Sequence, residues 1–131
     1  MDINNLTLKQ APFDDVNTTE YFAGKKVILF GLPGAFTPTC STKQLPGFEE
    51  MYEKFQEKGI FEIICVSVND AFVMSKWFQD QNIKNVRWLA DGSGVLTERL
   101  GMLCKKDNLG FGTRSWRYAA VINNGIVEQM F

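Results

Sequence analysis

Apolar and polar residues follow one another in blocks whose lengths suit short strands and helices. Nearly continuous apolar runs at residues 27–32 and 61–68 predict strands that are covered on both faces. Between them, four apolar residues share the i, i+3, i+4, i+7 spacing of one helix face: Phe48, Met51, Tyr52 and Phe55. This stripe predicts a core-facing amphipathic helix over residues 41–58, which Pro46 kinks or divides.

Shorter patterns predict the remaining elements. The further predicted strands are residues 6–8 at a sheet edge, 86–90, 116–122 and 126–131. The further predicted helices are residues 18–22, capped by Asn17 or Thr18, 71–81 and 95–100. Residues 102–114 hold two glycines and several polar residues and are predicted to form a loop, while Asn123-Asn124-Gly125 predicts a primed turn in a β-hairpin. Strand, helix, strand, helix and then a hairpin is the order of the α/β thioredoxin fold.

Composition and charge narrow the class of protein. A chain of 131 residues, 45% of them apolar, has the size and core of one domain, which we take as residues 1–131. Lys plus Arg total 14 and Asp plus Glu total 15, so nothing points to nucleic acid or an anionic membrane surface as a partner. No apolar run approaches the ~20 residues of a membrane helix. The first residues lack a basic stretch followed by an apolar core, so we expect no secretory signal.

Histidine is absent and cysteine is sparse, which restricts the possible chemistry. Without histidine, Ser-His and Cys-His catalysis in cis is excluded, and the commonest metal ligand is missing. Cys40, Cys65 and Cys104 form no CxxC pair, so neither zinc-site spacing nor a thioredoxin-like dithiol is present. We expect no metal and no cofactor, and a reducing compartment. A catalytic cysteine here must be activated by Arg, Lys or backbone dipoles.

Cys40 stands where the first long apolar strand gives way to a helical pattern. Amide N–H groups at a helix start have no partner within the helix and favour negative charge, so a thiol at this position tends to ionise. Thr37, three residues earlier, can bring a hydroxyl back beside the sulfur.

The segment from Pro33 to Cys40, PGAFTPTC, resembles the peroxidatic-cysteine loop of the peroxiredoxins, whose pattern is P-x-x-x-T-x-x-C. The Gly-Ala-Phe within it is similar to the peroxiredoxin-5 type, also called type II. Further matching segments follow in order along the chain: 45–48, 67–73, 91–94, 107–112 and 114–118. The resemblance covers roughly residues 17 to 131.

The resemblance implies a thioredoxin fold, with a central mixed sheet flanked by helices, and an oxidoreductase activity. It implies a thiol-dependent peroxidase that reduces hydrogen peroxide and alkyl hydroperoxides through the Cys40 thiolate, which cycles through sulfenic acid. A redox-sensing interaction module, in which Cys40 passes a disulfide to a partner protein, uses the same cysteine and stays open as the alternative. A binding-only domain would instead show a Cys40 pKa like that of a free thiol.

The resemblance also assigns roles to residues around Cys40. Pro33, which has no N–H, covers the sulfur, and Thr37 holds a peroxide oxygen against it. The amides of Thr39 and Cys40 bind the peroxide. Arg117 matches the arginine before the aromatic in the family's R-x-x-R-[YF] segment and stabilises both the thiolate and the leaving oxygen.

Three further residues have less definite roles at this site. Arg114 either faces solvent or orients Arg117. Leu109 and Phe111 line the pocket entrance and shape it toward alkyl peroxides, an interpretation based on their loop position alone.

Ionisation alone does not explain a fast thiol peroxidase. A pKa lowered by three units raises the thiolate fraction of a free cysteine roughly thirtyfold at pH 7. The accompanying loss of nucleophilicity costs about twentyfold if the slope for disulfide exchange applies. Oriented donors that bind the transition state must therefore supply most of the acceleration.

The sulfenic acid must be reduced by a second thiol. Cys65 lies inside an apolar strand and is predicted to be a buried packing residue. Cys104, beside Lys105 and Lys106, is the better candidate in this chain, but an external thiol such as glutathione, glutaredoxin or thioredoxin is favoured.

Relatives of this type continue past position 131 with a helix that packs on the sheet. We therefore expect a truncated C-terminal part and some uncovered apolar sheet surface. Relatives also often pair, which favours a homodimer. The expected location is cytoplasmic, with an organelle open if a targeting segment precedes residue 1.

Overall fold

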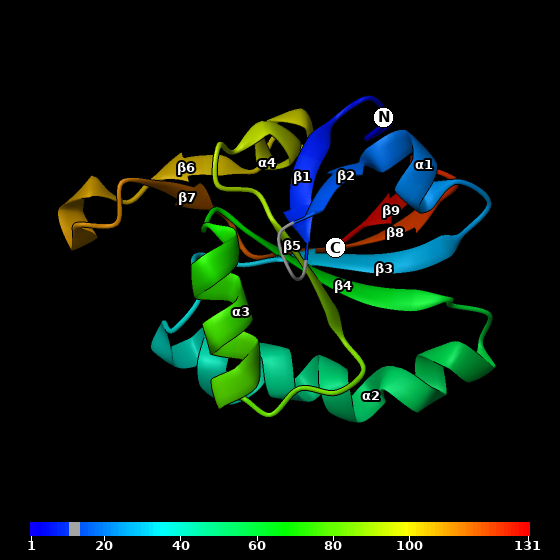
Figure 1. The fold of residues 1–131 in the computed structure, drawn as a ribbon, viewed down its shortest axis with the longest axis horizontal. Helices are drawn as coiled ribbons and strands as arrows, with labels where there is room; N and C mark the ends of the chain where they lie inside the picture. The colour runs from blue at the N-terminus through cyan, green and yellow to red at the C-terminus, as the bar shows by residue number, and fades with distance from the viewer. Residues whose placement is uncertain (11–13) are drawn as a thin grey trace.

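The computed structural model describes residues 1–10 and 14–131, without the side chains of Cys40 and Thr42. Its centre is a seven-stranded mixed sheet with the strand order β2-β1-β5-β4-β3-β8-β9 (Figure 1). The strands of this sheet are β1 (Thr7–Gln10), β2 (Asp14–Asn17), β3 (Lys26–Gly31), β4 (Glu62–Ser67), β5 (Arg87–Ala90), β8 (Tyr118–Asn123) and β9 (Ile126–Met130). Strands β3, β4 and β5 are parallel and the other pairs are antiparallel.

Helices cover both faces of this sheet (Figure 1). The helical segments are α1 (Thr18–Phe22), the π-helical turn η1 (Cys40–Gln44), α2 (Leu45–Glu57), α3 (Ala71–Asp80), α4 (Val95–Arg99) and the 3-10 turn η2 (Asp107–Leu109). Helices α2 and α3 pack on the face formed by Ile28, Phe30 and Cys65, and α1 and α4 lie over Val27 and Leu29. This arrangement explains the continuous apolar runs and confirms the thioredoxin-like α/β fold. None of the helices in the described part is long and apolar enough to cross a bilayer.

Two predicted connections are confirmed in detail. Asn17 caps α1, with its Oδ1 accepting a hydrogen bond from the amide of Thr19 at 2.9 Å. The turn between β8 and β9 has positive φ at both central residues, 52° at Asn124 and 79° at Gly125, as a primed hairpin turn requires.

Two predictions for the sheet are wrong. Strand β1 is not an edge strand, because it pairs with β5 on one side and with β2, which the sequence analysis missed, on the other. Residues 102–114 are not a loop: β6 (Leu103–Lys105) and β7 (Thr113–Ser115) pair in antiparallel fashion around η2. This hairpin projects from the body of the molecule at the left of Figure 1.

The long helix is divided as Pro46 suggested. The π-helical turn η1 ends at Gln44 and α2 begins at Leu45, which places the proline in the first turn of α2, where its missing N–H costs nothing. Phe48 stacks on Phe30 with ring centroids 4.1 Å apart, but Met51 is 41% exposed. The predicted core stripe is therefore wrong for Met51, because only Phe48, Tyr52 and Phe55 of this stripe pack against the core.

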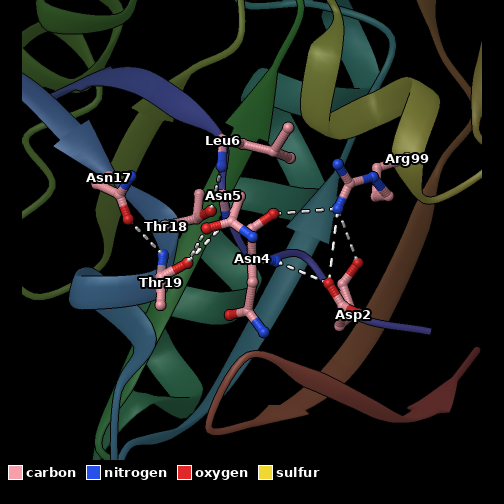
Figure 2. Close-up of polar contacts among 8 residues, drawn as sticks. All are labelled: Asp2, Asn4, Asn5, Leu6, Asn17, Thr18, Thr19 and Arg99. Atoms are coloured by element: carbon pink, nitrogen blue, oxygen red, sulfur yellow. Dashed lines mark hydrogen bonds and ion pairs between the residues drawn. The ribbon is translucent and has the colours of Figure 1, made fainter.

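The N-terminal segment is attached to the body by polar contacts shown in Figure 2. The Nη1 of Arg99 donates to the carbonyl of Asn4 at 3.1 Å and lies 3.6 Å from Oδ1 of Asp2. Next to these residues, the amide of Ile3 donates to the carbonyl of Gly125 at 2.9 Å, and the Ile3 side chain is fully buried. The first residues thus complete the core on the α4 side.

Tyr118 contains an unsatisfied polar group, which yields a stability prediction. Its ring packs on Gly31, where an added Cβ would collide with it, and its hydroxyl is buried without a hydrogen-bond partner in the described part of the chain. Burial, followed by the nearby charge of Asp91, raises the pKa of this phenol, so it stays neutral. We expect Tyr118→Phe to raise the free energy of unfolding by about 1 kcal/mol in urea titrations, since it removes a desolvated hydroxyl and keeps the ring. A loss of stability in this variant would show that the hydroxyl has a partner.

Candidate active site

The segment that follows β3 leads from the carboxyl end of a central strand to the predicted nucleophile, Cys40, at the start of η1. The amide of Ser41 donates to the carbonyl of Thr37 at 3.0 Å, so the amides of Thr39 and Cys40 fall in the first turn of the helix, where no internal acceptor precedes them. The backbone thus provides the polarised helix start expected for Cys40. The Cys40 side chain lies outside the described part of the structure, and its role stays a prediction.

Thr37 is held in one orientation by its own turn. Its Oγ1 donates to the carbonyl oxygen of Gly34 at 2.7 Å, across a turn in which Phe36 has a positive φ of 64°. Because the hydroxyl proton is engaged there, the lone pairs of Oγ1 are left to accept a hydrogen bond. Thr37 is therefore suited to accept from the O–H of a peroxide.

Arg117 reaches the helical turn that carries Cys40. The register of β3 with β8 pairs Gly31 with Tyr118, which places the residue before β8 opposite the start of the loop of residues 32–39. The Nε of Arg117 donates to Oε1 of Gln44 at 2.7 Å. Since Gln44 closes the same π-helical turn that Cys40 opens, this contact brings a permanent positive charge to that turn.

Arg114 contacts the loop through two backbone carbonyl groups. Its Nη1 donates to the carbonyl of Pro33 at 3.4 Å and its Nε to the carbonyl of Phe111 at 3.1 Å. A Cβ at Gly34 would collide with the guanidinium, so glycine there permits the close approach. Arg114 therefore does not face solvent, which corrects one predicted alternative, and its role in orienting Arg117 stays a prediction.

The residues predicted to line the entrance differ in their burial. Phe111 is half-buried and packs on Arg114, with 5.3 Å between the guanidinium carbon and the ring centre. Leu109 lies in η2 at the far end of the hairpin and is 58% exposed. The side chain of Thr39 is exposed, and Pro33 is half-buried. No described contact tests the lining roles, which stay predictions.

Three polar residues around the loop escaped the sequence analysis. Gln44 accepts a hydrogen bond from Arg117. The sequence feature that could have identified it is a polar residue in the same helical turn as Cys40. The Oδ1 of Asn69 accepts from the amide of Ala35 at 3.0 Å, and the Nε1 of the buried Trp77 donates to Oγ of Ser41 at 2.9 Å. Asn69 lies in the connection after β4, and Trp77 lies in α3. The position of Asn69 just past the carboxyl end of a parallel strand could have suggested a site, because the ends of parallel strands meet at one edge of a sheet.

The other two cysteines have different environments. Cys65 is fully buried in β4, as predicted. Cys104 is half-buried in β6, directly opposite Arg114 of β7, and not at the edge of a loop. Within residues 1–10 and 14–131, no three Cys, Asp or Glu side chains gather in a way that could hold a metal ion.

Comparison with known proteins finds a matching family model and similar curated proteins. The family model described as Redoxin matches residues 2–131. A peroxiredoxin of Rhizobium etli is 62% identical over 119 residues, covering 91% of this chain and 66% of its own length. The chain thus spans just under two thirds of that curated relative.

Solved structures show the same similarity. The reduced Prx3 of Vibrio vulnificus in complex with hydrogen peroxide superposes with a TM-score of 0.94 at 44% identity, over 99% of this chain and 83% of that one. Peroxiredoxin 5 from Alvinella pompejana gives a TM-score of 0.90 at 31% identity, over 100% of this chain and 86% of that one.

Proposed function

Because the chain belongs to the redoxin family, as a peroxiredoxin of the type II or peroxiredoxin-5-like group, we propose that it is a thiol-dependent peroxidase whose nucleophile is the Cys40 thiolate. The sulfur attacks one peroxide oxygen, the O–O bond breaks, and the other oxygen leaves as hydroxide or alkoxide. Cys40 is left as a sulfenic acid. The observation that carries the proposal is the contact of Arg117 with Gln44, which joins a distant cation to the helical turn of Cys40.

The surrounding groups suit each stage of this displacement. The helix-start amides and the Arg117 charge favour the thiolate, and both can stabilise the oxygen on which negative charge develops. Thr37 accepts from the peroxide O–H and so holds that oxygen against the sulfur, which leaves the other oxygen to depart. None of these groups changes its charge, which keeps the site organised throughout the reaction.

We propose both hydrogen peroxide and alkyl hydroperoxides as substrates. The structure of one relative contains hydrogen peroxide, and in this chain the Thr37 hydroxyl can accept from a peroxide of that size. An apolar groove of about 330 Å³ begins beside Gln44 and runs along α2; its lining residues are Lys43, Gln44, Gly47, Phe48, Met51 and Phe55. This groove offers an apolar surface to the alkyl chain of a larger hydroperoxide.

An external thiol completes the proposed cycle. It attacks the sulfenic sulfur to release water and form a mixed disulfide, and a second thiol then restores Cys40. Burial of Cys65 supports a reductant from outside the chain. We propose glutathione, glutaredoxin or thioredoxin for this role.

We expect sustained peroxide consumption, over many equivalents of protein, when one of these three thiols is supplied. The measurement is peroxide loss with glutathione, with glutaredoxin plus glutathione, and with thioredoxin plus its reductase, each without protein as the blank. Consumption that stops at one equivalent, followed by a mixed disulfide with a single protein, would instead favour the redox-sensing module. Cys40 alkylation at pH 6 as slow as that of a free thiol would favour the binding-only domain.

The assembly and the location of the protein stay predictions. A homodimer is supported by four exposed apolar side chains on the loop, α3 and the β6–β7 hairpin region: Phe36, Phe72, Leu109 and Trp116. Sedimentation velocity over a concentration series and cell fractionation would test the dimer and the cytoplasmic location.

A further inference from the structure

Asn69 connects the sheet to the loop of residues 32–39 through a single oxygen atom. Its Oδ1 accepts from the Ala35 amide at 3.0 Å and from the hydroxyl of Ser67 at 2.5 Å. Ser67 is fully buried at the end of β4. Its hydroxyl orients the Asn69 side-chain amide so that the oxygen, and not the nitrogen, points at the loop. Asn69 therefore fixes the backbone at residue 35 relative to the core strand β4.

The conformation of the backbone at residues 35 and 36 depends on its contact with Asn69. Ala35 is 8% exposed, so its amide would be left without an acceptor if the Asn69 carbonyl were lost. The next residue, Phe36, has a φ of 64°, a left-handed conformation that costs a non-glycine residue about 1–2 kcal/mol. Such a conformation persists only where the surroundings fix it.

The geometry of Thr37 depends on this turn. Its hydroxyl bond to Gly34 closes the turn from residue 34 to residue 37. Arg114 braces the first side of the turn at Pro33, and Asn69 braces it at Ala35. If either contact is lost, the Thr37 oxygen is free to shift.

We infer that Asn69 is a positioning residue for peroxide reduction: it fixes the turn that aims the Thr37 acceptor at the peroxide. The inference rests on the proposed peroxidase function and adds to it a residue that acts through another residue. Asn69 acts on the alignment of the substrate and not on the ionisation of the thiol. Misplacement of reacting groups by about 1 Å can cost roughly a hundredfold in rate.

The test compares two reactions of the same sulfur. Reaction with hydrogen peroxide needs the aligned acceptor, whereas alkylation by iodoacetamide needs only an accessible thiolate. We expect Asn69→Ala to lower the second-order rate constant with peroxide at least tenfold and to change the alkylation rate constant by less than threefold. A merely structural role would move both rate constants together, or neither, and would show mainly as a lower melting temperature.

Two further variants sharpen the test. Asn69→Asp keeps an acceptor for both donors but adds a negative charge, which raises the pKa of Cys40; its peroxide rate should be low at neutral pH and should recover to within threefold of the parent at alkaline pH. Ser67→Ala removes the hydroxyl that orients the amide and should lower the peroxide rate about threefold; this variant decides the matter if Asn69→Ala fails to fold. Asn123→Ala, which removes an exposed asparagine whose Nδ2 donates to Glu128, is the control and should react like the parent.

An Asn69→Ala protein that folds and keeps the parent peroxide rate would overturn the inference, as would equal losses in both reactions. If the parent itself does not react with peroxide through Cys40, the proposed function fails, and that outcome is distinct from a parent that reacts and an Asn69 variant that reacts equally well.

Discussion

Replacing Cys40 with serine will reduce the second-order rate constant with hydrogen peroxide by at least roughly a thousandfold, to the background of free solution. The serine hydroxyl is not ionised at neutral pH, and the oriented groups around position 40 cannot supply the missing nucleophile. Stopped-flow mixing with excess peroxide, followed by intrinsic fluorescence or by competition with a second thiol peroxidase, measures the rate.

Cys104→Ser is the matched control for this experiment. It removes a half-buried sulfur from β6 and leaves the loop of residues 33–40 intact, so the first oxidation should proceed at the parent rate. The same variant decides whether Cys104 takes part in reduction: unchanged turnover with an external thiol would exclude it. If Cys40→Ser consumes peroxide as fast as the parent, the proposed nucleophile is wrong.

The parts of the fold that the sequence predicted are those fixed by local patterns. Strands β3 and β4 are continuous apolar runs because both of their faces are covered, and α3 shows a helical stripe because one side faces the sheet. The ends of these elements shift by one or two residues, since capping contacts decide them.

The parts that escaped prediction depend on pairing between distant segments. Strands β6 and β7 have three residues each and stay together only through their mutual register, which no short window reveals. Strand β1 lies inside the sheet because β2 adds beyond it, and the polar sequence of β2 gave no apolar signal. In both cases the tertiary partner, and not local propensity, determines the strand.

The candidate site divides in the same way. Cys40 and Thr37 could be found because they lie in one short motif at a strand-to-helix boundary. The partners of Arg117 and Arg114 could not, because they depend on the register of β3 with β8 and on a glycine that lets a guanidinium approach. Asn69 was visible only as part of a matching segment, since its role requires knowing that Ala35 lies opposite it.

Replacing Arg117 with alanine will lower the second-order rate constant with hydrogen peroxide at least tenfold, and about a hundredfold if the arginine contributes as much as one oxyanion-hole donor does elsewhere. The loss has two separable parts. Without the positive charge the pKa of Cys40 rises, so fewer molecules carry a thiolate at neutral pH. The leaving oxygen also loses a donor, which lowers the rate at every pH.

A pH series separates these two parts. The loss of thiolate is recovered as the pH rises above the pKa of Cys40 in the variant, because the thiolate is then fully formed. The loss of the donor to the leaving oxygen persists as a constant deficit in rate at alkaline pH. Arg117→Lys keeps a charge but not the planar group whose Nε contacts Gln44, so it should restore more of the ionisation than of the transition-state stabilisation.

The control for this variant is Arg99→Ala, which removes an arginine that contacts only the N-terminal segment in the described hydrogen bonds. It should leave the peroxide rate unchanged at every pH. A parent-like rate for Arg117→Ala would remove that arginine from the reaction and would leave its contact with Gln44 as a structural link between β8 and η1. A deficit that vanishes completely at alkaline pH would confine its role to ionising the sulfur, because stabilisation of the leaving oxygen does not depend on how many thiols are ionised beforehand.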